Sequence, residues 1–192
     1  SALIFGGRRA NTVPLVLQSF SWTHGVYLGA TMGSETTAAA TSAVGVVRRD
    51  PMAMLPFLGY DAGSYLQHWL DMQDRIPNPP KIFMVNWFRK NSEGKFVWPG
   101  YGDNMRVLKW ILDRSHGRTN AQETVIGWTP IEGDLDLTGM EASKESAEQA
   151  TRIDLGEWQH EIEDTKEWFD KIGKTLPVQL ELTRLLLLAS VK

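Results

Sequence analysis

The stretch from Phe83 to Trp110 constrains the fold of this chain more than any other part of its sequence. It includes most of a short apolar run, residues 81–87, which lies between prolines and charged residues. Such a run is typical of a buried strand. Apolar residues then recur at helical spacing over residues 104–116, with Asp103 as the expected N-cap and Gly117 as the stop. The sequence therefore predicts a strand, a long loop and a helix.

Aromatic residues are concentrated in this stretch. The chain holds 8 Trp, 7 Phe and 4 Tyr, and seven of these 19 residues fall within 28 positions, far more than an even spread would place there. They are Phe83, Trp87, Phe88, Phe96, Trp98, Tyr101 and Trp110, and the cations among them are Arg89, Lys90, Lys95, Arg106 and Lys109. Aromatic rings beside cations suit a flat base that carries phosphates. The pattern favours nucleotide binding.

A packed aromatic core is the alternative interpretation. Strand and helix positions in a core account well for Phe83, Trp87 and Trp110. The other four aromatic residues lie on the expected loop among charged residues, glycine and proline: Phe88, Phe96, Trp98 and Tyr101. A core explains these four less well, but spacing alone leaves both interpretations open.

Charge is distributed unevenly along the chain. Residues 1–120 carry 13 Lys and Arg against 8 Asp and Glu, whereas residues 121–192 carry 7 against 15. The first part is therefore expected to attract anions such as phosphate. Acidic surface helices that cluster near the C-terminus would explain the same numbers.

The composition excludes several classes of protein. A chain that is 42% hydrophobic and 22% charged is not wholly disordered. Without cysteine it has no disulfide framework, no Cys-ligated zinc and no thiol nucleophile. Its longest apolar run, at residues 185–189, is far shorter than the ~20 residues that span a bilayer. We expect a globular domain in the cytoplasm.

A segment between Gly33 and Gly45 has no large apolar side chain before Val44. It therefore has little to anchor it to a core, and glycine at both ends would let it hinge as a mobile active-site lid. A surface loop or a short alanine-rich helix is the alternative for these residues.

The remaining pattern alternates strands and helices. An apolar strand over residues 2–5 leads into a Gly6-Gly7 turn that is expected to present Arg8 and Arg9. Further elements are expected at residues 21–32 (helix), 60–72 (helix), 124–129 (strand), 154–172 (acidic helix capped by Asp154 and ended by Gly173) and 177–191 (helix). This alternation predicts a mixed α/β domain.

Two catalytic patterns fail on inspection. Gly173-Lys174-Thr175 lacks the glycine that a phosphate-binding loop needs five positions earlier, where Trp168 stands. We interpret it as the end of a helix. The four histidines form no local metal-ligand spacing and are expected to be structural or solvated.

Residues 86–90, 94–104 and 106–108 closely resemble the guanine-binding segment of GTP-dependent phosphoenolpyruvate carboxykinase. Residues 5–9 resemble the phosphate-contacting turn of that family, residues 34–40 its omega-loop lid and residues 50–60 the segment that follows. The resemblance is close from residue 1 to about residue 130 and looser in the C-terminal helices. Ala10 stands where the family usually has proline, and Tyr101 where phenylalanine is common.

The resemblance implies an activity and a role for each matching residue. The family decarboxylates and phosphorylates oxaloacetate with GTP to give phosphoenolpyruvate, GDP and CO2, with Mn²⁺ and Mg²⁺ as metals, in gluconeogenesis. Phe88 and Tyr101 would sandwich the guanine, Phe96 would close its edge, Asn104 would hydrogen-bond it and Arg8 would hold the transferring phosphoryl group. The lid would comprise Thr36, Thr37, Ala38, Ala39, Ala40, Thr41, Ser42, Ala43, Val44, Gly45 and Val46.

The resemblance also implies that the chain is part of a longer polypeptide. The phosphate loop and the metal ligands of the family lie upstream of the stretch that matches Ser1, so no metal ligand is expected here. We expect part of the C-terminal nucleotide-binding domain of a two-lobed, monomeric enzyme. Residues 1–130 would form the guanine site and lid, and residues 131–192 an acidic helical segment of the same domain.

These expectations also define the partners of the chain. They are GTP or GDP, oxaloacetate or phosphoenolpyruvate, and the remainder of the polypeptide, with no nucleic acid and no membrane. By itself the chain is expected to be inactive. A stand-alone, noncatalytic guanine-nucleotide binding module is the alternative.

Overall fold

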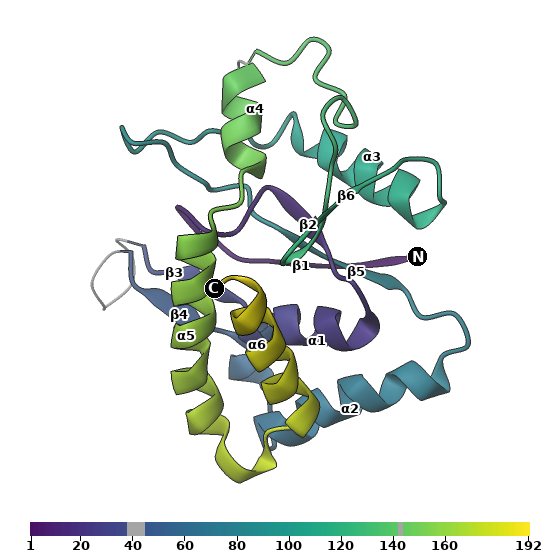
Figure 1. Cartoon of the computed structure of the whole chain (residues 1–192), viewed down its shortest axis with the longest axis vertical. Coiled ribbons are helices and arrows are strands. Elements are labelled where there is room, and N and C mark those ends of the chain that lie inside the picture. Colours follow the sequence, from purple (N-terminus) through teal and green to yellow (C-terminus); the bar gives the residue numbers. More distant parts are fainter. Residues whose placement is uncertain (38–44, 142–143) are drawn as a thin grey trace.

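A five-stranded mixed sheet with helices on both faces organises the chain (Figure 1). The computed structural model describes residues 1–37, 45–141 and 144–192. The strands are β1 (Ala2–Gly6), β2 (Val16–Gln18), β3 (Gly33–Glu35), β4 (Val47–Arg49), β5 (Lys81–Val85), β6 (Gln122–Thr124) and β7 (Gly127–Thr129). The order in the large sheet is β1-β5-β2-β7-β6, with β1 parallel to β5 and the other pairs antiparallel, while β3 and β4 form a separate hairpin.

Six α-helices are found in the described part of the chain: α1 (Trp22–Thr31), α2 (Ala62–Arg75), α3 (Asn104–Ser115), α4 (Lys144–Thr151), α5 (Leu155–Ile172) and α6 (Val178–Ser190). Short 3-10 turns occur at η1 (Pro51–Ala53), η2 (Leu55–Phe57) and η3 (Gly173–Thr175). No helix in residues 1–37, 45–141 or 144–192 has both the length and the apolar character needed to cross a bilayer.

Strand β5 shows why the sheet needs helices on both faces. Successive side chains of a strand point to opposite faces. Ile82 and Met84 therefore pack in one core with α1, α2, α5 and α6, whereas Phe83 and Val85 pack in a second core with α3 and α4. Figure 1 shows the two groups of helices on opposite sides of the sheet. The buried strand predicted at residues 81–87 is observed at residues 81–85.

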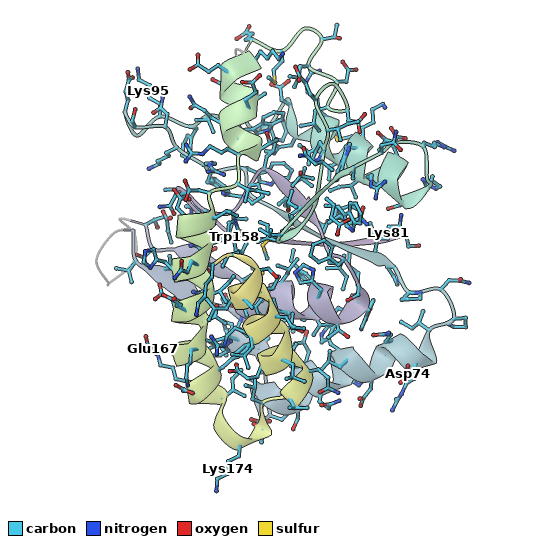
Figure 2. The ribbon with its side chains drawn as sticks, viewed as in Figure 1. Asp74, Lys81, Lys95, Trp158, Glu167 and Lys174 are labelled. Carbon is cyan, nitrogen blue, oxygen red and sulfur yellow. The ribbon has the colours of Figure 1, made fainter. Side chains whose placement is uncertain are left out.

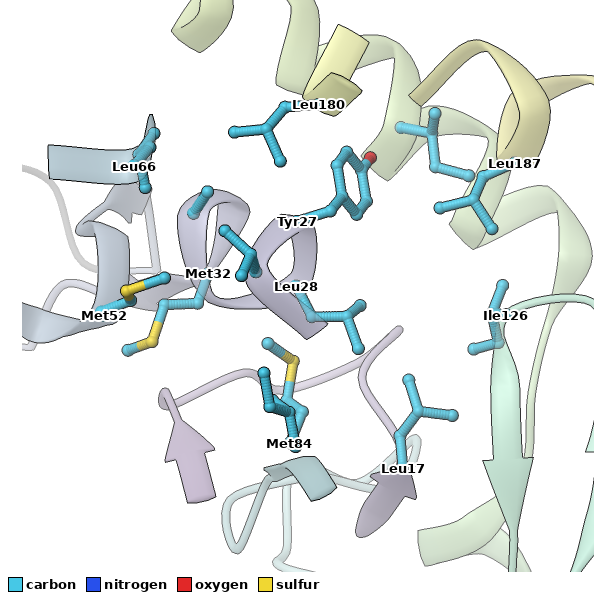
Figure 3. Close-up of a cluster of buried hydrophobic side chains, with 14 of the residues drawn as sticks. Leu17, Tyr27, Leu28, Met32, Met52, Leu66, Met84, Ile126, Leu180 and Leu187 are labelled. Atoms are coloured by element: carbon cyan, nitrogen blue, oxygen red, sulfur yellow. The ribbon is translucent and has the colours of Figure 1, made fainter. Parts of the chain in front are cut away.

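The larger core joins the N-terminal and C-terminal parts of the chain. Figure 3 shows Tyr27 and Leu28 of α1 between Met84 of β5 and the α6 residues Leu180 and Leu187. All five side chains are buried. The acidic helical segment therefore contributes apolar residues to the same core as the expected nucleotide-binding segment.

Helix α5 is amphipathic, as its sequence predicts. The Asp154 side chain accepts a hydrogen bond from the backbone N–H of Glu157, and Gly173 ends the helix with a positive φ of 71°. Figure 2 shows Trp158 directed into the molecule and Glu167 directed away from it. The Gly173-Lys174-Thr175 sequence is thus a helix end, as predicted.

Two sequence expectations need correction. The single strand expected at residues 124–129 is a hairpin, in which β6 and β7 pair through a turn at Val125 and Ile126. The Thr124 hydroxyl closes this turn by donating to the backbone oxygen of Gly127 at 2.7 Å. Helix α4 had no counterpart in the sequence analysis.

Candidate nucleotide-binding site

The turn that follows β1 holds Arg8 by its backbone. The Arg8 N–H donates to the Ser34 hydroxyl oxygen at 3.0 Å, and the Arg8 carbonyl accepts from the Glu35 N–H at 2.8 Å. The side chain donates from Nη1 to the Glu35 carbonyl at 3.1 Å, and its guanidinium carbon lies 5.4 Å from the centre of the Phe88 ring. The Arg8 guanidinium is therefore placed against an aromatic ring.

Gly7 allows the close approach of this turn to β3. A Cβ atom at Gly7 would collide with the carbonyl oxygen of Gly33, and backbone cannot yield as a flexible side chain can. We expect Gly7→Ala to displace the turn and to lower the free energy of unfolding by about 1–3 kcal/mol. Thermal unfolding measures this effect. Gly59→Ala is the control, because a Cβ there meets no atom, and an equal loss in both variants would contradict the prediction.

Arg9 does not face the site, contrary to the expectation that the turn presents both arginines. It is 4% exposed and donates from both terminal nitrogens to the Glu161 carboxylate, at 2.9 and 2.5 Å. Arg49 donates to the same carboxylate from a third direction. Burial alone would raise the pKa of Glu161, but the two guanidiniums hold that pKa below its usual value. The three residues form a buried Arg–Glu–Arg triad.

The residues after Arg9 are fixed by groups from two other elements. The Thr12 N–H donates to the Glu157 carboxylate of α5 at 2.7 Å, while Thr12 itself has a positive φ of 62°, which is rare for a β-branched residue. Asn86, at the end of β5, donates from Nδ2 to the carbonyls of Arg9 and Val13 at 2.9 and 2.8 Å. The backbone around Arg8 is therefore held by α5, β3 and β5.

Phe88 and Phe96 lie together at the base of a short hairpin. Lys90 and Phe96 form an antiparallel bridge, and the Val97 N–H donates to the Arg89 carbonyl at 3.0 Å. The Phe88 and Phe96 rings meet edge to face with centres 6.1 Å apart, and the Lys90 ammonium lies 5.4 Å from the Phe96 ring centre. Figure 2 shows Lys95 at the far tip of this hairpin.

Two hollows adjoin these rings, and both are lined by Arg8 and Phe88. One of about 240 Å³ also includes Ser34 and Trp87. The other, of about 320 Å³, also includes Thr36, Lys90 and Phe96 as well as Glu35, Thr37 and Gly45. Aromatic rings and cations thus line both hollows.

Tyr101 and Trp98 differ from the other aromatic residues of the loop. Tyr101 is 98% exposed, contacts no other aromatic ring in the described residues and lines neither hollow, so its stacking role stays a prediction. Trp98 is 2% exposed and belongs to the core on the α3 side of the sheet, so the packed-core alternative is correct for this residue. Its indole N–H donates to Asn104 Oδ1 at 2.9 Å.

The expected lid, residues 36–46, is described only at its two ends. Residues 38–44, which include Ala38, Ala39, Ala40, Thr41, Ser42, Ala43 and Val44, lie outside the described residues. At the ends, the Thr36 N–H donates to the Val46 carbonyl at 2.9 Å, and the Gly45 N–H donates to the Thr36 carbonyl at 3.0 Å. These bonds continue the β3–β4 hairpin. Gly33 is buried in β3 opposite Arg49, and its role as a hinge stays a prediction.

Acidic and histidine side chains do not gather into a metal site in the described part of the chain. No group of three or more His, Cys, Asp or Glu there is arranged to hold a metal ion. Sequence patterns did not reveal the Arg–Glu–Arg triad or the bond between Thr12 and Glu157. The partners in each of these contacts are more than 100 residues apart.

A family model described as the phosphoenolpyruvate carboxykinase C-terminal P-loop domain matches residues 1–186. Among curated relatives, a protein of Anaeromyxobacter sp. (strain K) named phosphoenolpyruvate carboxykinase (GTP) is 72% identical over 192 residues, which are all of this chain and 32% of the relative. Proteins of the same name from Paenarthrobacter aurescens and Treponema pallidum are 52% and 53% identical over 94% and 93% of this chain, and 30% of each relative.

The chain thus spans about a third of the length of these relatives. The family model covers nearly all of it, including the Arg8 turn, the Phe88–Phe96 hairpin and the C-terminal helices. The chain therefore belongs to the phosphoenolpyruvate carboxykinase C-terminal P-loop domain family.

Proposed function

We propose that this chain is the C-terminal part of a GTP-dependent phosphoenolpyruvate carboxykinase, which converts oxaloacetate and GTP into phosphoenolpyruvate, GDP and CO2. The meeting of Arg8, Phe88 and Phe96 around one open hollow carries this proposal. The names of the relatives, and their greater length, support it. A gluconeogenic role in the cytoplasm, and contacts with the rest of the polypeptide, follow from the same assignment.

The aromatic hairpin would bind the guanine base. Phe88 offers a ring for stacking, and Phe96 stands edge-on to it, where it would close the edge of the base. Tyr101 would cover the other face of the base, and its full exposure leaves the ring free to do so. Asn104 would donate to the base from its amide. The 320 Å³ hollow then has room for the phosphates beside Lys90 and Arg8.

Arg8 would stabilise the transferring phosphoryl group. One terminal nitrogen already donates to the Glu35 carbonyl, which leaves other N–H groups of the guanidinium for phosphate oxygens. Because the backbone of the turn is fixed, the charge is placed before the reaction begins, and such prior placement lowers the barrier to phosphoryl transfer. Residues 36–46 would close over the site and keep water from the enolate formed by decarboxylation.

Divalent metal ions, manganese and magnesium, would neutralise phosphate charge in the full-length enzyme. The described residues do not fit such a site, because no cluster of three or more acidic or histidine side chains occurs among them. We therefore assign no ligand and no step of the reaction to a metal in this chain.

Phe88→Ala tests the guanine pocket. Removing the ring removes a stacking surface worth ~1–3 kcal/mol, so the Kd for GDP should rise roughly 5- to 150-fold. Calorimetric titration of the full-length protein with GDP measures this change. A parallel titration with ADP measures selectivity for guanine. An assay of oxaloacetate-dependent GTP consumption distinguishes an enzyme from a noncatalytic binding module.

Phe57→Ala is the matched control, because Phe57 is 75% exposed and lines neither hollow. This variant should bind GDP as the wild type does. If Phe88→Ala and wild type bind GDP equally, the assignment of the pocket is wrong. GDP binding without any turnover of oxaloacetate would favour the stand-alone module.

A further inference from the structure

The hydrogen bond between Trp98 and Asn104 fixes which end of an amide faces the candidate site. An indole N–H can only donate, so the atom of Asn104 that lies 2.9 Å from Trp98 Nε1 is the amide oxygen. The NH2 end of the same amide must then point away from Trp98. This orientation is dictated by the chemistry of the partner.

Burial makes this orientation hard to reverse. Trp98 is 2% exposed, and a buried N–H without a partner is costly. If the Asn104 amide turned over, two donors would face each other and the indole N–H would lose its acceptor. Trp110 differs: it is equally buried in the same core, but its indole N–H has no partner in the described residues.

The free end of the Asn104 amide is available to a ligand. Asn104 is the first residue of α3 and half-buried, and its backbone N–H donates to the Gly100 carbonyl at 3.0 Å. In the described part of the chain, Nδ2 donates to no other group, and it is not enclosed by protein. The NH2 end of the side chain therefore offers its hydrogen-bond donors to a base.

We propose that Trp98 sets the base preference of the nucleotide site by holding the Asn104 amide with its NH2 group outward. This inference rests on the guanine pocket proposed above. Guanine carries an acceptor, O6, at the position where adenine carries a donor, N6–H2. A fixed donor pairs with guanine and opposes adenine. Trp98 is a positioning residue, which acts through Asn104 and does not touch the base.

The test is the ratio of GDP to ADP affinity in the full-length protein, measured by calorimetry. Trp98→Phe keeps an aromatic ring in the core but removes the N–H, so the Asn104 amide can turn its oxygen to adenine. The ratio of the two affinities should fall at least about fivefold, since base discrimination by side-chain hydrogen bonds is of this order or larger. If Trp98 had only a structural role, the affinities for GDP and ADP would fall together and their ratio would not change.

Trp110→Phe is the matched control, because it makes the same change in the same core without altering a hydrogen bond. It should keep the wild-type ratio. Asn104→Asp provides a second variant that leaves the packing of Trp98 intact: its carboxylate still accepts from the indole but presents an oxygen to the base, so the ratio should fall here too.

The outcomes separate this inference from the proposed function. If Phe88→Ala weakens GDP binding but Trp98→Phe and Asn104→Asp keep the wild-type ratio, the inference is overturned and the pocket remains. An equal fall of the ratio in Trp110→Phe overturns it as well. If wild type binds no GDP, or Phe88→Ala binds it unchanged, the proposed pocket and the inference both fail.

Discussion

Glu161→Gln should lower the free energy of unfolding by about 3–5 kcal/mol, the range observed when one partner of a buried ion pair is removed. The substitution keeps the shape of the side chain but removes the carboxylate that the Arg9 and Arg49 guanidiniums share. Arg9 is 4% exposed, so water cannot replace the lost carboxylate. Urea unfolding at pH 7.5 measures the loss.

Glu167→Gln on the same helix is the matched control. Its side chain is 79% exposed and pairs with Lys171 at 2.9 Å across one helical turn, so its removal should cost no more than about 0.5 kcal/mol. A cost below about 1 kcal/mol for Glu161→Gln would mean that the arginines find other partners, and that the triad does not hold the Arg8 turn in place.

The protein should lose about 2 kcal/mol of stability between pH 7.5 and pH 5 through His24 alone. His24 is 5% exposed, and burial lowers its pKa from 6.5 to about 4. Its Nδ1 accepts from the Phe20 N–H at 3.1 Å, its ring stacks on Phe20 with centres 4.9 Å apart, and Nε2 has no partner in the described residues. Burial, which disfavours the protonated ring, is the cause of this shift.

The direction follows from the two pKa values. Above pH 6.5 the ring is neutral in both the folded and the unfolded chain, and stability is at its full value. As the pH falls through 6.5 only the unfolded chain takes up a proton, so stability is lost until the folded ring titrates near pH 4. Urea unfolding across this range measures the slope, and NMR titration of the ring measures the folded pKa directly.

Substitution at two histidines isolates the effect. His24→Asn removes the titrating ring and retains an acceptor near Nδ1, so its stability should change less with pH than that of the wild type. His160→Asn should keep the wild-type slope, because the His160 side chain is 82% exposed. The same slope in His24→Asn and wild type would show that His24 does not cause the loss.

Elements with strong local signals were predictable from the sequence. In α5 the capping residue, the final glycine and the apolar stripe all agree, and the structure places each as expected. The β6–β7 turn carries no such signal. Val125 and Ile126 are β-branched residues that favour strands, and they turn because Ile126 is buried in the main core and Thr124 closes the turn. Tertiary contacts there outweigh local preference.

The sequence predicted which types of residue gather near the candidate site, but not which individual residues face it. The cluster of rings and cations in residues 83–110 indicated a base and a phosphate, and Phe88 and Phe96 do meet. Spacing could not show that Trp98 would be buried. Nor could it show that Arg8 faces the hollow while Arg9 turns inward, since the difference depends on Glu161 in a distant helix. A count of charged residues therefore predicts surface charge correctly only when buried ion pairs between distant residues are known.

The pairing of Arg9 with Glu161 determines when during translation this ion pair can form. The two residues are 152 positions apart, so a ribosome adding about 5–20 residues per second makes the carboxylate roughly 8–30 s after the guanidinium. During that interval Arg9 lacks the carboxylate that binds both of its terminal nitrogens. The ion pair that fixes Arg9 beside the Arg8 turn therefore cannot form until α5 has been synthesised.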